Sequence, residues 1–143
     1  MSQSNASSLE EVLSGLGDVL SNEGQARLRI LRLGKPVSLQ ASTRDQIYLM
    51  VQEAVLNAVR HWQSTFIKLE IEYRPKQLRL RVQDNGSGVD FKDIQSERSA
   101  RLRLMGLWER ADAIGAQLRV WSRERSGMLV EMSVPINRLN IQA

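Results

Sequence analysis

Residues 43–61 read TRDQIYLMVQEAVLNAVRH, and this stretch decides the fold. Apolar residues recur in it every three or four positions, which is the spacing of one face of an α-helix. They are Ile47, Val51, Ala54, Val55 and Ala58. Just before them, Ser42 and Asp45 form a capping-box pattern that satisfies free backbone N–H groups at a helix start. The stretch predicts a long helix over 43–61 with one buried face.

Three polar side chains, Glu53, Asn57 and His61, follow one another on this helix at a spacing of four. Because 3.6 residues make one turn, each lies about 40° round from the last, so the three form one stripe. Such a stripe is either a solvated helix face or a ligand site. In a ligand site, Glu53 polarises a water or hydroxyl, a half-exposed Asn57 offers its amide oxygen to Mg²⁺, and His61 faces a phosphate.

The sequence that follows the helix predicts a β-hairpin and then a glycine-rich turn. Apolar and charged residues alternate over 67–73 and 78–82, and DNGSG follows at 84–88. Asp84 either caps a simple turn or forms the floor of a pocket, where its carboxylate accepts a hydrogen bond from an exocyclic amine such as that of adenine. Gly86 and Gly88 allow backbone conformations and close approach that other residues resist.

Outward from this centre, the patterns predict two further helices and three further strands. The helices are expected at 8–21, where Ser8 and Glu11 form another capping box, and at 104–114; the strands are expected at 26–33, 117–122 and 128–134. Residues 89–103 are predicted to be a loop, and 1–7 and 136–143 to be tails. The order fits one α+β domain over 8–135. It is a two-layer sandwich of a mostly antiparallel five-stranded sheet with three helices on one face.

Composition excludes several classes of protein. The 143 residues include no cysteine and one histidine, so disulfides, cysteine-based zinc sites and histidine-rich metal sites are excluded. No apolar run approaches the roughly 20 residues of a membrane span, and no signal segment opens the chain. We therefore expect a cytoplasmic domain without membrane contact.

Positive charge is concentrated after residue 24. The net charge is +4, but residues 1–24 carry four acids and no base, so the remainder carries +8. A segment with this much positive charge either binds an anionic partner or simply has a solvated basic surface. Aromatic residues are only 5% of the chain and none lies among the arginines of the strands, so the stacking platforms of a nucleic-acid surface are absent. We expect no nucleic-acid partner.

Together these motifs resemble the GHKL ATPase superfamily, which includes histidine kinases, gyrase-type enzymes and certain chaperones. The segment Gln52–His61 is similar to the N box of short, nitrate-sensor-like sensor histidine kinases, and Gly106–Asp112 (GLWERAD) is similar to the start of their lid helix. The resemblance covers residues 8–135. The order and spacing of the motifs are more specific than any one of them.

The resemblance implies a Bergerat-type site for ATP and Mg²⁺. By position, Glu53 would be the catalytic acid or base, Asn57 would bind Mg²⁺, and His61 would lie near the phosphates. Asp84 would bind the adenine amino group, and Gly86 and Gly88 would form the adenine-side turn and lid hinge. The γ-phosphate would pass to a histidine in a separate dimerisation domain, and then to the receiver domain of a response regulator.

The sequence departs from the family pattern in the lid. Arg103 and Leu104 stand where the family usually has Gly-Leu, and Gly106 keeps only the later glycine of that stretch. Arg103 either reaches a phosphate or prevents the lid backbone from approaching one. Two alternatives therefore stay open beside a kinase domain. One is a degenerate, non-catalytic partner-binding module, and the other is a stand-alone serine kinase of the anti-sigma-factor type.

Overall fold

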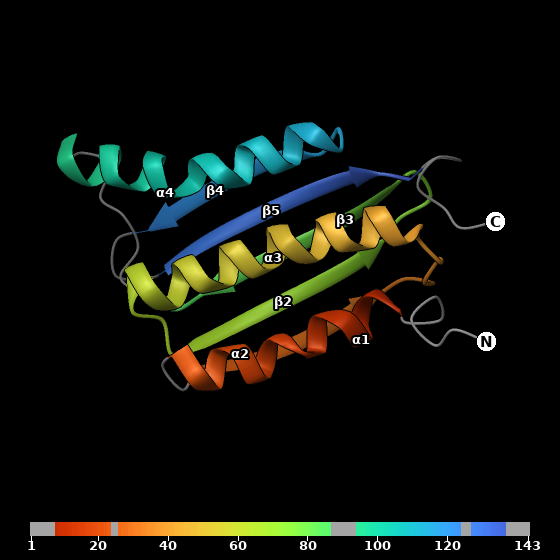
Figure 1. The fold of residues 1–143 in the computed structure, drawn as a ribbon, viewed down its shortest axis with the longest axis horizontal. Helices are drawn as coiled ribbons and strands as arrows, with labels where there is room; N and C mark the ends of the chain where they lie inside the picture. The colour runs from red at the N-terminus through yellow and green to blue at the C-terminus, as the bar shows by residue number, and fades with distance from the viewer. Residues whose placement is uncertain (1–7, 24–25, 87–93, 124–126, 137–143) are drawn as a thin grey trace.

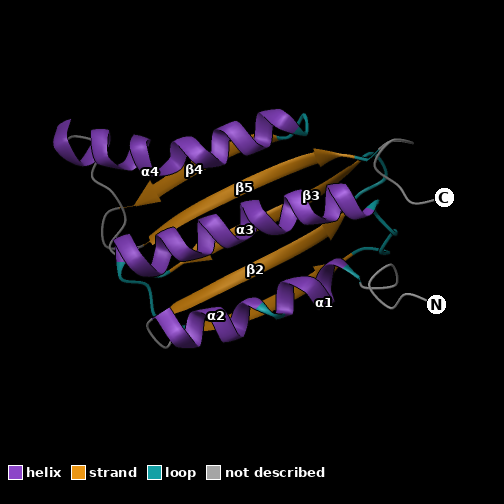
Figure 2. Cartoon of the chain, in the orientation of Figure 1, coloured by secondary structure: helices purple, strands orange, loops and turns teal. Residues whose placement is uncertain are grey.

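The computed structural model describes residues 8–23, 26–86, 94–123 and 127–136, which form a five-stranded sheet with its helices on one face (Figures 1 and 2). The elements are α1 (Leu9–Ser14), α2 (Leu16–Glu23), β1 (Arg27–Leu33), α3 (Ala41–Trp62), β2 (Phe66–Tyr73), β3 (Gln77–Asp84), α4 (Ile94–Ala113), β4 (Gln117–Arg123) and β5 (Gly127–Pro135). The prediction of a two-layer α+β fold is confirmed. The tails at 1–7 and 137–143 lie outside the described residues. Within the described part, no helix is long and apolar enough to cross a membrane.

The sheet has the strand order β1-β2-β3-β5-β4. Strand β1 pairs parallel with β2, and every other neighbouring pair is antiparallel. The parallel pair is possible because α3 carries the chain back across the sheet between β1 and β2. Residues of β2 and β3 alternate between buried and partly exposed, as a sheet covered on one face requires. The inward-facing residues of these two strands are Ile67, Leu69, Ile71, Tyr73, Leu78, Leu80 and Val82.

The predicted helix at 8–21 is two helices, α1 and α2, separated at Gly15. The backbone N–H of Gly15 donates to the carbonyl of Val12 at 3.3 Å, a tighter turn than an α-helix makes. Glycine costs a helix up to about 1 kcal/mol relative to alanine, which explains the break at this position. The expected cap is present, since the Ser8 hydroxyl accepts from the backbone N–H of Glu11 at 3.1 Å.

Helix α3 begins at Ala41, and the predicted capping role of Ser42 is wrong. Gln40 is the N-cap residue; its backbone is extended and it makes no side-chain cap bond. Its carbonyl already accepts from the N–H of Arg44 at 2.9 Å, so Ser42 lies inside the first turn, where a hydroxyl cannot cap. The helix ends at Trp62, and Gln63 follows in the left-handed conformation, with φ 55°.

Helix α4 begins at Ile94, so the predicted loop is wrong over 94–103. No glycine or proline lies between 94 and 105, and this segment contains several good helix formers, including Ala100, Leu102 and Arg103. Arginine in place of the lid glycine therefore favours continuation of the helix backbone. The helix ends at Ala113, and Gly115 follows with φ 69°. The N–H of Ala116 then donates to the carbonyl of Ala111 at 2.8 Å, which closes the helix end.

A hydrogen bond ties α1 to the sheet. The Tyr73 hydroxyl, on β2, donates to Oε1 of Glu10 at 2.8 Å. Tyr73 is buried, and both burial and the neighbouring Glu10 carboxylate raise its pKa, while Arg32 opposes the shift. The bond holds the first helix against the β1–β2 half of the sheet.

Candidate functional site

The carboxylate of Glu53 lies at the contact between α3 and α4. A Cβ atom added to Gly106 of α4 would lie 2.7 Å from Oε1 of Glu53 and 3.0 Å from Oε2. Those separations are too short for a real side chain, so the absence of one at Gly106 lets α4 rest on the carboxylate. Oε2 of Glu53 is buried and has no hydrogen-bond partner in the described part of the chain. A buried carboxylate oxygen without a partner carries a desolvation cost, which a hydrogen-bond donor would relieve.

Asn57 and His61 follow Glu53 along α3, toward the helix end that leads into β2. The prediction that Asn57 is half exposed is wrong: only 8% of it is accessible, because it lies on the side of α3 that faces the rest of the domain. The backbone of His61 is in the last turns of α3, and its side chain lies outside the described residues. At Asn57 the polar stripe is therefore buried, so this part of it is not a solvated helix surface.

Asp84 ends β3 and is buried, with 6% of its surface accessible. Its Oδ1 atom accepts from the backbone N–H of Gly86 at 2.7 Å and from that of Met128 at 3.3 Å. Both of the hydrogen bonds found for this carboxylate within the described residues go to Oδ1. The turn-capping role is thus present, and it fixes the orientation of the carboxylate.

Asn85 holds the same turn against the start of β2. Its Oδ1 atom accepts from the backbone N–H groups of Thr65 at 2.9 Å and Phe66 at 3.0 Å. Because Asp84 pairs with Ile67 across the sheet, the turn lies at the end of the sheet where α3 leads into β2. Figure 1 shows that the C-terminal part of α3, the N-terminal part of α4 and this end of β3 all lie on the left side of the view. The fold therefore brings the two predicted motifs to one end of the domain.

Gly127 is a further residue of this site, and in the sequence it lies just before the strand predicted at 128–134. Its φ is 93°, and a Cβ atom there would collide with the backbone carbonyl of Asp84. Glycine at 127 lets β5 start directly against the aspartate and lets Met128 donate to it. The signal available in the sequence was a glycine immediately before an alternating apolar strand.

The remaining predicted site residues have different placements. Gly86 is buried next to Asp84, whereas Gly88 lies outside the described residues. Leu104 is 2% exposed and packs in the hydrophobic core. The backbone of Arg103 is helical, and its side chain lies outside the described residues.

A metal ion at this end of the domain would depend on few protein ligands. In the described ranges there is no group of three or more His, Cys, Asp or Glu side chains able to hold one. Mg²⁺ commonly binds through one or two protein oxygens and completes its shell with phosphate oxygens and waters. An amide such as that of Asn57, one helical turn after Glu53 on α3, fits a magnesium ion that arrives with a nucleotide.

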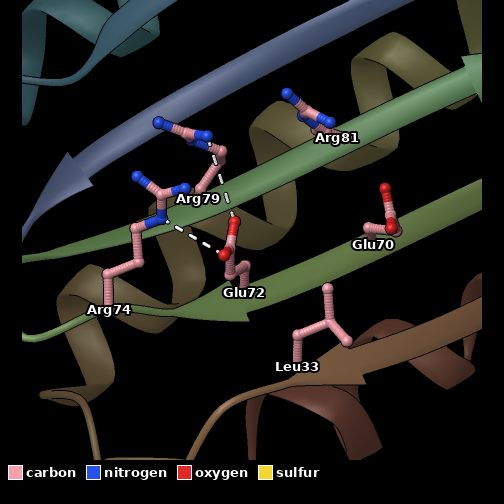
Figure 3. A pocket seen from close by; sticks show the side chains of 6 residues that line it. All are labelled: Leu33, Glu70, Glu72, Arg74, Arg79 and Arg81. Atoms are coloured by element: carbon pink, nitrogen blue, oxygen red, sulfur yellow. Dashed lines mark ion pairs between the residues drawn. The ribbon is translucent and has the colours of Figure 1, made fainter.

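A separate pocket of about 250 Å³ lies on the open face of the sheet, away from the helices (Figure 3). Its lining residues are Leu33, Glu70, Glu72, Arg74, Arg79 and Arg81. Here Arg74 Nε lies 3.2 Å from Glu72 Oε2, and Arg81 Nε lies 2.8 Å from Oε2 of the buried Glu131. These arginines thus have nearby carboxylate partners, which reduces their attraction for an external polyanion.

The sheet order and the helical layer are those of a GHKL-type ATPase domain. Residues 42–138 match the family model described as histidine kinase-, DNA gyrase B-, and HSP90-like ATPase. This chain belongs to that family, whose domains bind ATP.

Sensor proteins are among its relatives. The chain is 36% identical over 94 residues to the sensor protein VraS of Staphylococcus saprophyticus, a match covering 66% of this chain and 26% of that protein. The VraS protein of Staphylococcus haemolyticus is 37% identical over the same length. The matched region thus spans about a quarter of these relatives. Membership of the nitrate-sensor-like subgroup stays a prediction.

Solved structures share the fold. The histidine kinase domain of the blue-light activated kinase of Erythrobacter litoralis EL346 matches with a TM-score of 0.73 at 21% identity, covering 92% of this chain and 63% of that one. Acinetobacter baumannii histidine kinase AdeS matches with a TM-score of 0.68 at 16% identity, covering 91% and 64%. At these identities the likeness concerns the fold.

Proposed function

We propose that residues 8–135 are the catalytic domain of a sensor histidine kinase, which binds Mg²⁺–ATP and donates the γ-phosphate to a histidine of a dimerisation domain. The observation that carries the proposal is the buried carboxylate of Asp84, which two backbone N–H groups hold in place. The single histidine of this chain, His61, is part of α3, so the acceptor belongs to another segment or chain. Since ATP is the substrate, we assign the domain to the cytoplasm.

At the adenine end, Asp84 selects the base. Gly86 and Met128 hold Oδ1, so Oδ2 is left to accept a hydrogen bond from the exocyclic amine of adenine. Guanine presents a carbonyl at that ring position, and two acceptors would then face each other without a proton between them. Burial of the carboxylate makes such a mismatch costly. Gly86 and Gly88 form the turn on which this part of the site depends.

The polar stripe of α3, formed by Glu53, Asn57 and His61, binds the phosphates and the reacting groups; we call this part of the site the phosphate end. Asn57 ligates Mg²⁺, which when bound neutralises charge on the phosphates. His61 and Arg103 supply positive or hydrogen-bonding contacts to phosphate oxygens. Glu53 accepts a hydrogen bond from the imidazole that receives the phosphoryl group, which orients the ring and stabilises the charge that develops on it.

Two protein partners follow from this function. The first is the histidine-containing dimerisation domain, which must approach the phosphate end near Glu53. The second is the receiver domain of a response regulator, which takes the phosphoryl group from that histidine. Neither role requires nucleic acid or a membrane surface.

Calorimetric titration with ADP and with a non-hydrolysable ATP analogue, each with Mg²⁺, tests the proposal. We expect saturable binding of one nucleotide per chain, weaker when Mg²⁺ is chelated. Failure to bind either nucleotide at millimolar concentration would overturn it.

One observation favours a second candidate, a degenerate domain that binds a partner without nucleotide. Helix α4 runs without interruption through the position where the family resemblance places a glycine-containing lid, and it rests on Glu53 through Gly106. In that case neither nucleotide would bind, although the fold would melt cooperatively. The same titration therefore separates the two functions.

A further inference from the structure

Helix α4 carries an exposed apolar stripe that no described element covers. Leu102 is 63% exposed, Met105 is 50% exposed and Trp108 is 39% exposed, although the same helix buries Leu104, Leu107 and Ala111. In Figure 1, α4 is the outermost helix of the layer, with α3 on one side of it and β4 behind it. Adjacent exposed apolar side chains of this size are typical of an interaction surface.

The stripe has an internal symmetry centred on Met105. Leu102 precedes it by three residues and Trp108 follows it by three, so they lie about 60° to either side of it. Arg98 precedes it by seven residues and Asp112 follows it by seven, which places both within about 20° of Met105 on the helix surface. Both charged side chains are exposed. Along this face a positive side chain, the apolar residues and a negative side chain thus follow one another. The two charges are equally far from Met105.

We propose that this stripe is a self-association surface, on which α4 pairs antiparallel with α4 of a second copy around a two-fold axis at Met105. Such an axis brings residues equally far before and after Met105 opposite each other. Arg98 then lies opposite Asp112 of the partner subunit, and Leu102 lies at the same level along the helix pair as Trp108 of the partner subunit. Met105 meets its own counterpart.

Charge complementarity favours a second copy over other occupants. The same helix face carries both a positive side chain, Arg98, and a negative one, Asp112. In an antiparallel pair each Arg98 meets the Asp112 of the other copy, so two ion pairs form. A parallel pair would place Arg98 beside Arg98 and Asp112 beside Asp112. A single helix pair buries far less surface than a standard stable interface, so the association is weak and depends on concentration.

Sedimentation velocity on charge variants tests the pairing. Between about 10 μM and about 1 mM, the range of weak association, we expect the wild-type sedimentation coefficient to rise with concentration. Arg98→Asp and Asp112→Arg should each weaken self-association at least about tenfold, since each places like charges opposite each other. Mixing the two variants should restore association, because every facing pair in the mixed dimer is again opposite in charge. A wild type that stays monomeric, or a mixture no better than either variant alone, would overturn the proposal.

Cross-linking tests the position of the axis. The chain has no cysteine, so Met105→Cys introduces a single thiol at the residue that meets its own counterpart. Under mild oxidation we expect a disulfide-linked dimer from this variant. Gln83→Cys, at an exposed position on the open sheet face, is the matched control and should stay monomeric. Equal cross-linking of the two variants would contradict an axis at Met105, and circular dichroism checks that both remain folded.

Discussion

The backbone of Gly106 on α4 lies directly against the carboxylate of Glu53 on α3, with no room for a Cβ atom between them. The glycine lowers the helix propensity of α4 by about 1 kcal/mol, yet it permits this contact. This contact predicts an energetic coupling between the proposed catalytic carboxylate and helix α4.

A double-mutant cycle measures this coupling. In a Glu53→Ala background, Gly106→Ala should raise the free energy of unfolding by about 1 kcal/mol through helix propensity alone. In the wild-type background the gain should be smaller or reversed, because the carboxylate must move. Urea denaturation of the four proteins gives the difference. Equal effects in both backgrounds would show that the two residues are independent.

Asp84→Asn should remove the selectivity for adenine. The wild type is expected to bind ADP at least about tenfold more tightly than GDP, since mismatched buried polar groups cost about 1–3 kcal/mol. Asparagine keeps an Oδ1 acceptor for Gly86 and Met128, so the turn should survive while the preference is lost. The control is Asn85→Ala, which removes the bonds to Thr65 and Phe66 and should lower stability without changing the nucleotide ratio. Equal affinity of the wild type for ADP and GDP would refute the adenine pocket.

Asn57→Ala should weaken binding of Mg²⁺–ADP by about tenfold or more, while binding of ADP in a chelator changes little. Because Asn57 is buried, the substitution should also cost about 1–3 kcal/mol of stability, so titrations belong well below the melting temperature. Asn57→Asp should instead shift the dependence on metal concentration. Gln52→Ala removes another amide of α3, five residues before Asn57, so it serves as the control and should leave metal dependence unchanged.

Gly127→Ala should destabilise the domain by more than about 2 kcal/mol. The cost combines an unfavourable positive φ with a collision against the Asp84 carbonyl. Gly115→Ala separates these causes, since Gly115 also has a positive φ, 69°, but nothing lies within 4 Å of its Cβ position. That control should lose only about 1–2 kcal/mol, the conformational part. Chemical denaturation that ranks the two variants equally would argue against the close approach of β5 to Asp84.

Stability should fall at alkaline pH because of Tyr73. Its pKa is raised in the folded state by burial and by the Glu10 carboxylate, so the protonated hydroxyl is favoured by folding. This contribution is fully present below the ordinary tyrosine pKa of about 10 and is lost as pH rises above it, by up to about 1.4 kcal/mol per pH unit. Tyr73→Phe should flatten this part of the profile. Urea melts between pH 8 and about 11 test it, and a Phe variant with an unchanged slope would assign the effect to other groups.

Local patterns in the sequence were enough to predict most elements, but not their ends or long-range contacts. Alternation over Ile67–Tyr73 and Leu78–Val82 predicted the hairpin, because a half-buried sheet imposes that period. The first ten residues of α4, 94–103, were expected to form a loop because they are mostly polar and show no apolar period, so only helix propensity marks them. The contact of Gly106 with Glu53 joins residues 53 positions apart, and no local pattern encodes it. The same holds for the closeness of Gly127 to Asp84.

The strand order leaves β1 and β4 at the two borders of the sheet, where no strand of the described residues pairs with their outer N–H and C=O groups. Such borders can template unwanted strand addition and fibrous aggregation. Arg27, Arg29 and Arg32 lie along β1, and Arg119 lies on β4. An approaching copy of either strand would bring these cations together, which costs free energy before any backbone bond can form. Part of the strong positive charge beyond residue 24 thus protects the native fold itself, with no anionic ligand required.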